Sequence, residues 1–178
     1  MSLATQIRPE MTMEQIMDIA PAAQRALFQR YHVGGCSSCG FQPSDTLAQV
    51  CKDHNILDIN EVVRTIVNAQ EADAQLQVSC AAVKGWLDAG ERFLFLDVRM
   101  PEELALAKIA QSEALDYDNP GKYMELPKDS KIVFHCKSGV RSMKALRFLR
   151  EQGFKYVKSV KGGINGWSDE VDPSVPKY

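Results

Sequence analysis

Cys136 stands where several features that activate a thiol come together. It directly follows the apolar run 131–135 and precedes residues 141–152, whose apolar spacing is typical of a helix. A cysteine in this place lies at the carboxyl end of a buried strand and faces the positive end of a helix dipole. Helix N-termini and nearby cations lower a cysteine pKa to roughly 3.5–7.5, so the reactive thiolate becomes abundant at neutral pH.

The residues after Cys136 suit an anion-binding loop. Ser138 and Gly139 are small enough for several backbone N–H groups to point inward. Lys137 and Arg141 supply positive charge, and a guanidinium can hold an anion with two parallel hydrogen bonds. The alternative is a buried, inert cysteine, but such a cysteine does not usually lie beside Lys, Arg and Gly. The pattern predicts a nucleophilic Cys136 with Arg141, in a substrate-binding loop of Lys137, Ser138, Gly139, Val140 and Ser142.

The elements that position this loop have the rhythm of an α/β domain. Apolar runs at 93–97 and 131–135 predict buried parallel strands, and residues 156–160 predict a further short strand. Helices are expected over 80–89, from Pro101 onwards and over 141–152, with a turn at Gly162-Gly163. Alternating strands and helices predict a parallel sheet flanked by helices.

The first part of the chain shows the pattern of short helices alone. Capping residues and apolar spacing predict helices over 12–19 and 22–30, one that begins after Ser44 or Asp45, and one after Asp58. We expect a loose tail over residues 1–10, an all-helical small domain over 11–68, a polar linker over 69–77 and the α/β domain over 78–178.

Composition narrows the function classes. The 178 residues are 45% hydrophobic and 25% charged, which is ordinary for a globular protein, and a net charge of -2 argues against nucleic-acid binding as the main activity. No apolar run approaches the roughly 18 residues of a membrane span. The N-terminus lacks the order of a secretory signal, and five irregularly spread cysteines do not form a disulfide framework. We expect a cytoplasmic protein with neither nucleic-acid nor membrane partners.

The Cys136 region also resembles the rhodanese family. Residues 135–142, His-Cys-Lys-Ser-Gly-Val-Arg-Ser, look like its active-site loop. Residues 95–99, Phe-Leu-Asp-Val-Arg, followed by Glu102-Glu103, resemble its early signature, and residues 161–167, Lys-Gly-Gly-Ile-Asn-Gly-Trp, match its closing pattern. The resemblance covers about residues 76–178. Where members usually carry Gly-His-Ile, this chain has Ala107-Lys108-Ile109 and so lacks a usual structural histidine.

This resemblance implies a rhodanese-type sulfurtransferase that needs no cofactor. Cys136 would take sulfane sulfur from thiosulfate or another small anionic donor, become a persulfide, and pass the sulfur to cyanide, a thiol or a sulfur-accepting protein. The loop amides would hold the terminal sulfur, while Arg141 and Lys137 would bind the donor. Asp97 and Arg99 are interpreted as residues that support the site rather than react.

Two other functions fit part of the pattern. A non-enzymatic sulfur carrier or sensor would load Cys136 once and hold the sulfur for a protein partner. A cysteine-dependent phosphatase also has His-Cys followed by Arg, but phosphatases of the related fold place five residues between Cys and Arg. Here four residues separate Cys136 from Arg141, which makes a tighter loop suited to a sulfur atom.

Cys36 and Cys39 form a second candidate site, in the helical domain. A CxxC turn is typical of a redox disulfide or of half a metal site. Residues 13–68 resemble a small helical domain found with hybrid-cluster proteins and described as a redox disulfide domain. We interpret the two cysteines as a redox pair coupled to Cys136. An inert pair remains an alternative, as does a metal site whose ligands would be Cys36, Cys39, Cys51 and His54.

Overall fold

The computed structural model describes residues 3–34 and 40–178 of the chain. It divides into two compact units, one that ends at Gln75 and one from Leu76 to Tyr178. Within the described residues, no helix is both long enough and apolar enough to cross a lipid bilayer.

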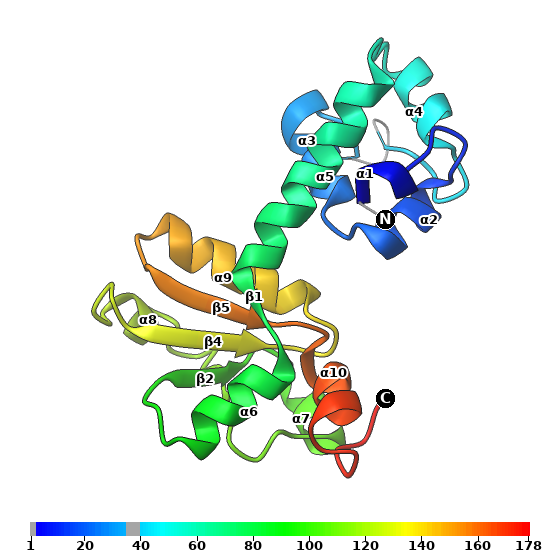
Figure 1. Ribbon diagram of the computed structural model, residues 1–178. Coiled ribbons are helices and arrows are strands. Elements are labelled where there is room, and N and C mark those ends of the chain that lie inside the picture. The colour runs from blue at the N-terminus through cyan, green and yellow to red at the C-terminus, as the bar shows by residue number, and fades with distance from the viewer. Residues whose placement is uncertain (1–2, 35–39) are drawn as a thin grey trace. The chain divides into compact units, whose positions relative to one another are not determined.

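The described part of the first unit consists of helices around one apolar core (Figure 1). They are α1 (Leu3–Gln6), α2 (Met13–Ile19), α3 (Ala23–Tyr31), α4 (Leu47–Asp53) and α5 (Ile59–Leu76). Thr12 caps α2 as predicted, because its side chain accepts from the Gln15 N–H and the Gln15 side chain accepts from the Thr12 N–H. The helices bury their apolar faces against each other, with Ile16, Leu27 and Ile66 fully inside.

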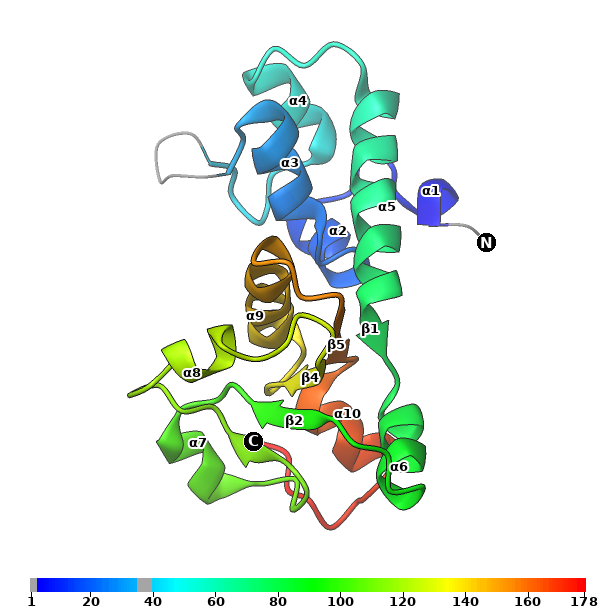
Figure 2. The same ribbon diagram turned by 90° about the vertical axis from the view of Figure 1, so that its left-hand side faces the viewer.

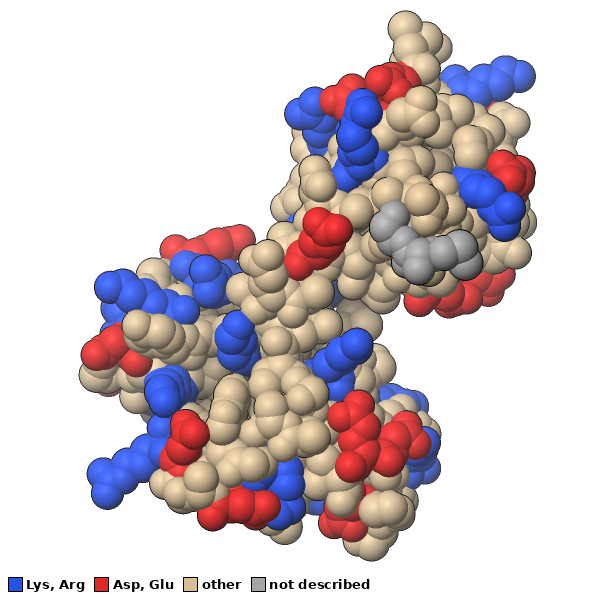
Figure 3. Space-filling view, viewed as in Figure 1, with Lys and Arg blue, Asp and Glu red and all other residues tan. Residues whose placement is uncertain are grey.

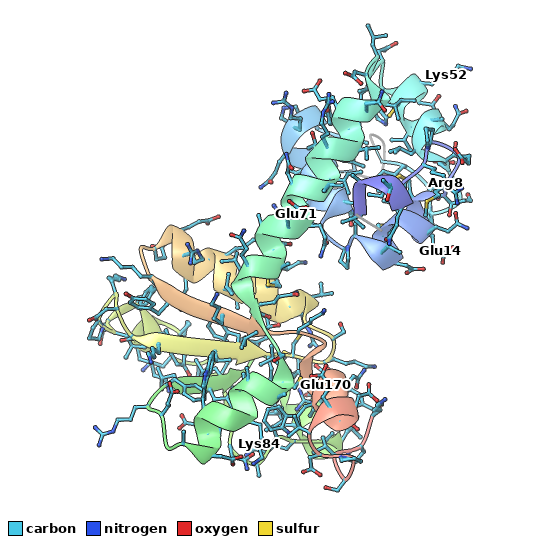
Figure 4. The ribbon with its side chains drawn as sticks, in the orientation of Figure 1. Arg8, Glu14, Lys52, Glu71, Lys84 and Glu170 are labelled. Atoms are coloured by element: carbon cyan, nitrogen blue, oxygen red, sulfur yellow. The ribbon has the colours of Figure 1, made fainter. Side chains whose placement is uncertain are left out.

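Residues 69–77 were expected to form a polar linker, and that expectation is wrong for residues 69–76. They continue α5, on which Figure 4 labels Glu71. The polar side chains have partners inside the unit: Asp73 pairs with Arg25 at 2.9 Å, and the Gln70 amide oxygen accepts from the Ala22 N–H at 3.1 Å. The polar side chains of residues 69–76 therefore belong to the last turns of α5, where they contact other residues of the unit.

Two further expectations for the first unit need correction. Residues 3–10 are not a loose tail, because they hold α1 and because Ile7 is buried in the core. The cap of α4 is Thr46, whose hydroxyl accepts from the Gln49 N–H, rather than Ser44 or Asp45. The Asp45 carboxylate instead accepts from the Gln42 N–H in the preceding turn.

The second unit contains the predicted parallel sheet, with strand order β1-β5-β4-β2-β3. The strands are β1 (Gln77–Val78), β2 (Leu94–Asp97), β3 (Glu113–Ala114), β4 (Lys131–His135) and β5 (Tyr156–Val160). The three longer strands match the strands predicted from the sequence. The two outer strands have two residues each, too few for an apolar or alternating pattern to reveal them.

Helices cover both faces of this sheet, as Figures 1 and 2 show. One face packs against α8 (Gly121–Met124) and α9 (Val140–Glu151), and the other against α6 (Cys80–Asp88) and α10 (Gly163–Glu170). The short α7 (Pro101–Leu106) follows β2. Alternation along β4 sends Ile132 and Phe134 to the α9 face and Val133 to the α10 face.

The register of the sheet brings polar groups to one edge. Asp97 pairs with His135 across β2 and β4, and Phe134 pairs with Ser159 across β4 and β5. All of these strands are parallel, so their carboxyl ends meet where the chain leaves β4 toward Cys136.

Arg99 is the largest polar side chain buried beneath that edge. Its guanidinium holds Asp97 through contacts of 2.6–3.0 Å and donates to the Ala107 carbonyl at 2.8 Å. Ile109 is fully buried. The segment that lacks the usual histidine is thus anchored by a main-chain oxygen and an aliphatic side chain.

His135 is buried next to this pair, and neither ring nitrogen has a hydrogen-bond partner among the residues that the structure describes. Its Nε2 lies 3.5 Å from an Asp97 oxygen, a contact that would be an ion pair only if the ring were protonated. Burial lowers the pKa of His135 to about 4, with Asp97 opposing the shift, so the ring is neutral at pH 7.

This neutral ring predicts a stability change in mild acid. The unfolded chain binds a proton at His135 below pH 6.5, whereas the folded chain does so only near pH 4, so the unfolding free energy falls as pH drops through that window. The slope due to His135 should be at most about 1.4 kcal/mol per pH unit. Denaturant unfolding between pH 7 and 4 should show a shallower fall for His135→Gln than for the wild type, and parallel curves would contradict the prediction.

Candidate active site

Cys136 lies in the turn between β4 and α9 and is only 1% exposed. The chain turns at Gly139, whose φ of 100° is left-handed and favours glycine. This turn aims the Gly139 N–H at the Cys136 sulfur, at 3.1 Å, and the Ser142 hydroxyl lies 3.5 Å from the same sulfur. The loop therefore places hydrogen-bond donors around the sulfur.

These donors determine the ionisation of Cys136. Burial raises the pKa of its thiol, but hydrogen bonds from the Ser142 hydroxyl and from the N–H groups of Ser142, Gly139 and Ser138 lower it by more. The net pKa lies below the ordinary value of 9.0. The loop thus favours the thiolate in a place that water hardly reaches.

The other two described cysteines show the opposite behaviour. Burial raises the pKa of Cys51 in α4, and burial followed by the charge of Glu170 raises the pKa of Cys80 to about 11. Cys80 lies on α6, which packs against α10; Figure 4 labels Glu170 near the end of α10. Both thiols stay protonated at neutral pH, so burial alone does not produce a reactive sulfur.

A second hydroxyl supports Ser142 from the sheet. The Ser159 Oγ lies 2.8 Å from the Ser142 Oγ, and both side chains are fully buried. The Ser142 Oγ also lies 3.0 Å from the Gly139 carbonyl oxygen, so its one proton has two acceptors within reach, this oxygen and the Cys136 sulfur. Sequence reasoning did not find Ser159; the available signal was a serine between Val157 and Val160 in an otherwise buried strand.

The start of α10 holds the loop from behind. The N–H groups of Ile164 and Asn165 donate to the carbonyls of Cys136 and Lys137, at 2.8 and 3.2 Å. Gly163 has a φ of 58°, and a Cβ there would lie 2.3 Å from the Cys136 carbonyl oxygen. Only a glycine allows this close approach of two backbone segments.

The loop cations have neighbours that the sequence did not predict. Arg141 makes a bidentate ion pair with Glu103 at 2.5 and 2.6 Å. The Tyr178 hydroxyl bridges a Glu103 oxygen and the Arg99 guanidinium, each at 2.8 Å. The Lys137 ammonium lies 4.5 Å from the centroid of the Tyr178 ring. Glu103 was noted only as part of a signature, and nothing in the sequence distinguished Tyr178.

The structure thus brings together Cys136, its loop residues, and the supporting Asp97 and Arg99. Cys36 and Cys39 lie outside the described residues, so the proposed redox pair and the four-ligand metal site cannot be placed. Among the described residues, no group of three His, Cys, Asp or Glu side chains could hold a metal ion. Cys51 belongs to the apolar core of the first unit.

Charge is mixed on the face drawn in Figure 3, where Lys and Arg side chains lie among Asp and Glu side chains on both units.

Comparisons with known proteins agree with this geometry. The model of the rhodanese-like domain family matches residues 79–170, about half of the chain. The chain is 42% identical over 98 residues to YtwF of Bacillus subtilis, a sulfurtransferase by name. The aligned residues cover 54% of this chain and 94% of YtwF. The chain is also 30% identical over 114 residues to MoeZ of Mycobacterium tuberculosis, by name an adenylyltransferase/sulfurtransferase. That alignment covers 62% of this chain and 29% of MoeZ.

One solved structure extends the comparison of the fold. Reduced CoADR-RHD of Bacillus anthracis aligns with a TM-score of 0.52 at 23% identity, and the alignment covers 91% of this chain and 27% of that chain. At this identity, the likeness concerns the fold alone.

The contact behind the loop predicts the effect of Gly163→Ala. The added methyl group would collide with the carbonyls of Cys136 and Lys137, so the loop must move and its N–H groups lose their aim at the sulfur. We expect Cys136 alkylation by iodoacetamide at pH 7 to slow at least about tenfold, the effect of one pKa unit. Gly85→Ala is the matched control, because nothing lies within 4 Å of that Cβ, and it should react as the wild type does. Equal slowing in both variants would contradict a specific role of Gly163.

Proposed function

The chain belongs to the rhodanese-like domain family and is a rhodanese-type sulfurtransferase, and on that premise we propose that its reaction proceeds through a persulfide on Cys136. The observation that carries the proposal is the set of donors around the buried sulfur, with the Gly139 N–H at 3.1 Å and the Ser142 hydroxyl at 3.5 Å. Of the three described cysteines, Cys136 alone has hydrogen-bond donors that outweigh burial, whereas the pKa values of Cys51 and Cys80 are raised.

The donor we propose is thiosulfate or a persulfide. The Cys136 thiolate attacks the outer sulfur of thiosulfate, the bond between the two sulfurs breaks, and sulfite leaves with the electron pair. The N–H groups of Ser138, Gly139 and Ser142, which hydrogen-bond the Cys136 sulfur, would bind the new outer sulfur. Lys137 would attract the anionic donor, together with Arg141 to the extent that Glu103 leaves its charge uncompensated. Cyanide or an acceptor thiolate next attacks the outer sulfur and releases the Cys136 thiolate. The chemistry uses no cofactor.

A sulfur carrier that loads once for a protein partner is the alternative function. Donors aimed at the sulfur stabilise the persulfide in either case, but they also stabilise the thiolate that must leave when the acceptor attacks. Stabilisation of the leaving thiolate favours turnover. Repeated formation of thiocyanate from thiosulfate and cyanide would separate the enzyme from the carrier.

The persulfide should form on Cys136. Reduced protein treated with thiosulfate should gain about 32 Da, the mass of one sulfur, and Cys136→Ser should not. Cys80→Ser is the matched control, because Cys80 is equally buried but its pKa is raised. It should load like the wild type. Loading of folded Cys136→Ser at the wild-type rate would refute the assignment.

We also propose that Cys36 and Cys39 accept the sulfur from Cys136. One thiolate attacks the outer sulfur and takes it from Cys136 as a persulfide. The thiolate of the second cysteine then attacks the Sγ of the cysteine that carries the extra sulfur. A Cys36–Cys39 disulfide forms, and the extra sulfur leaves as hydrosulfide with the electron pair. Because the pair must be reduced to attack, this step suits a reducing compartment such as the cytoplasm.

This relay predicts sulfide release within one chain. Protein loaded with one sulfur should release sulfide at a rate independent of protein concentration, because donor and acceptor share a chain. Cys36→Ser and Cys39→Ser should slow release, and the wild type should gain a disulfide as sulfide appears. Cys51→Ser, which removes a core thiol with a raised pKa, is the control. Release from a Cys36→Ser, Cys39→Ser double variant at the wild-type rate would rule out the relay.

A further inference from the structure

Glu103 offsets the positive charge that an anionic donor would meet beside Cys136. Its two carboxylate oxygens accept from the two terminal nitrogens of Arg141, at 2.5 and 2.6 Å. Its Oε1 also accepts from the Tyr178 hydroxyl at 2.8 Å, and its Oε2 from the Met100 N–H at 3.1 Å. Each oxygen thus has two donors, and the pair is fixed in a bidentate geometry.

The charge of Glu103 is permanent under any ordinary assay condition. The Arg141 guanidinium lowers the pKa of the Glu103 carboxyl to about 2, although burial opposes the shift. The Glu103 side chain is 20% exposed, so solvent screens its field only in part. Arg141 also lies within electrostatic range of the Cys136 thiolate, which contributes to the raised pKa of the guanidinium.

Of the cations Arg99, Lys137 and Arg141, the two arginines are each paired with a carboxylate, so Lys137 contributes most to the attraction of an anionic donor. Arg99 is buried and paired with Asp97, so these two cancel. Arg141 and Glu103 cancel in the same way, and Lys137 lies over the Tyr178 ring. A donor with two negative charges therefore approaches a thiolate across a loop with little net positive charge.

We infer that Glu103 is a specificity-determining residue that selects against doubly charged sulfur donors and favours donors with one net negative charge or none. Of the two donors proposed above, persulfides of small thiols belong to the favoured class, as do organic thiosulfonates. Thiosulfate reacts by the same step but belongs to the disfavoured class and should load Cys136 more slowly. The inference rests on the proposed persulfide chemistry of Cys136. It concerns which donor reaches the sulfur, not what happens there.

Coulomb's law gives this inference a quantitative signature. The repulsion between Glu103 and a donor is proportional to the donor charge, so the gain from neutralising Glu103 must scale with that charge. If Glu103→Gln accelerates loading by a singly charged donor about threefold, a doubly charged donor should gain about the square of that factor, roughly tenfold. Displacement of the Arg141 cation from the loop would have the opposite sign, a loss that grows with donor charge, and a general distortion of the loop would change the rate for all donors by one common factor.

Three donors of the same chemistry separate these effects. Thiosulfate carries two negative charges, methanethiosulfonate one, and zwitterionic 2-aminoethanethiosulfonate none. Each transfers its terminal sulfur to Cys136 and leaves with the electron pair as sulfite or a sulfinate. The measurement is the second-order rate constant of loading, followed by the mass gain of the intact protein, for the wild type, Glu103→Gln and Glu102→Gln.

Glu102 is the matched control because it lies in the same turn of α7, is exposed, and has the same charge. Relative to the wild type, Glu103→Gln should show a gain that grows with donor charge and shrinks in high salt, whereas Glu102→Gln should show little such slope. Equal gains or losses for all three donors, or equal slopes in both variants, would overturn the inference. If no donor loads wild-type Cys136, the proposed function itself fails.

Discussion

A buried thiolate has little water around it, so it depends on hydrogen bonds from the protein. At Cys136 these come from the Gly139 N–H, the Ser142 hydroxyl and neighbouring amides, and they outweigh the cost of burial. Cys80 is as deeply buried within the same unit, lacks this ring of donors, and has a pKa of about 11. The contrast indicates that loop geometry, rather than depth of burial, lowers the pKa of the Cys136 thiol.

That geometry depends on backbone segments far apart in the sequence. The loop leaves β4 and enters α9 through a left-handed Gly139, and the start of α10 closes behind it with hydrogen bonds to the Cys136 and Lys137 carbonyls. The Lys137 carbonyl is bound on one side, and the Ser138 N–H of the same peptide hydrogen-bonds the sulfur on the other. The Gly162-Gly163 turn is therefore as much a part of the site as the residues next to the sulfur.

Much of this architecture could be predicted from the sequence, because its signals are local. A few consecutive residues are enough to identify each of these features: the segments that form β4 and β5, the Thr12 cap and the Cys136 loop. The linker prediction was wrong since the contacts of Asp73 and Gln70 with α3 are tertiary, and a polar helix face looks like a linker until its partner is known. Ser159 and Tyr178 were missed for the same reason. They reach the site through the fold, across distances in the chain that no motif spans.

The buried Asp97–Arg99 pair gains its functional meaning from this long-range connection. Arg99 holds Asp97 beneath the sheet edge and also donates to Tyr178, which donates to Glu103, which in turn holds Arg141 beside the loop. A fully buried guanidinium with a compensated charge moves little, so it is a fixed reference for the outer groups. The early Asp-Val-Arg signature and the loop arginine, some forty residues apart, thus belong to one network. Because that network places a carboxylate against the loop cation, the interior of the domain takes part in determining how much positive charge a sulfur donor meets.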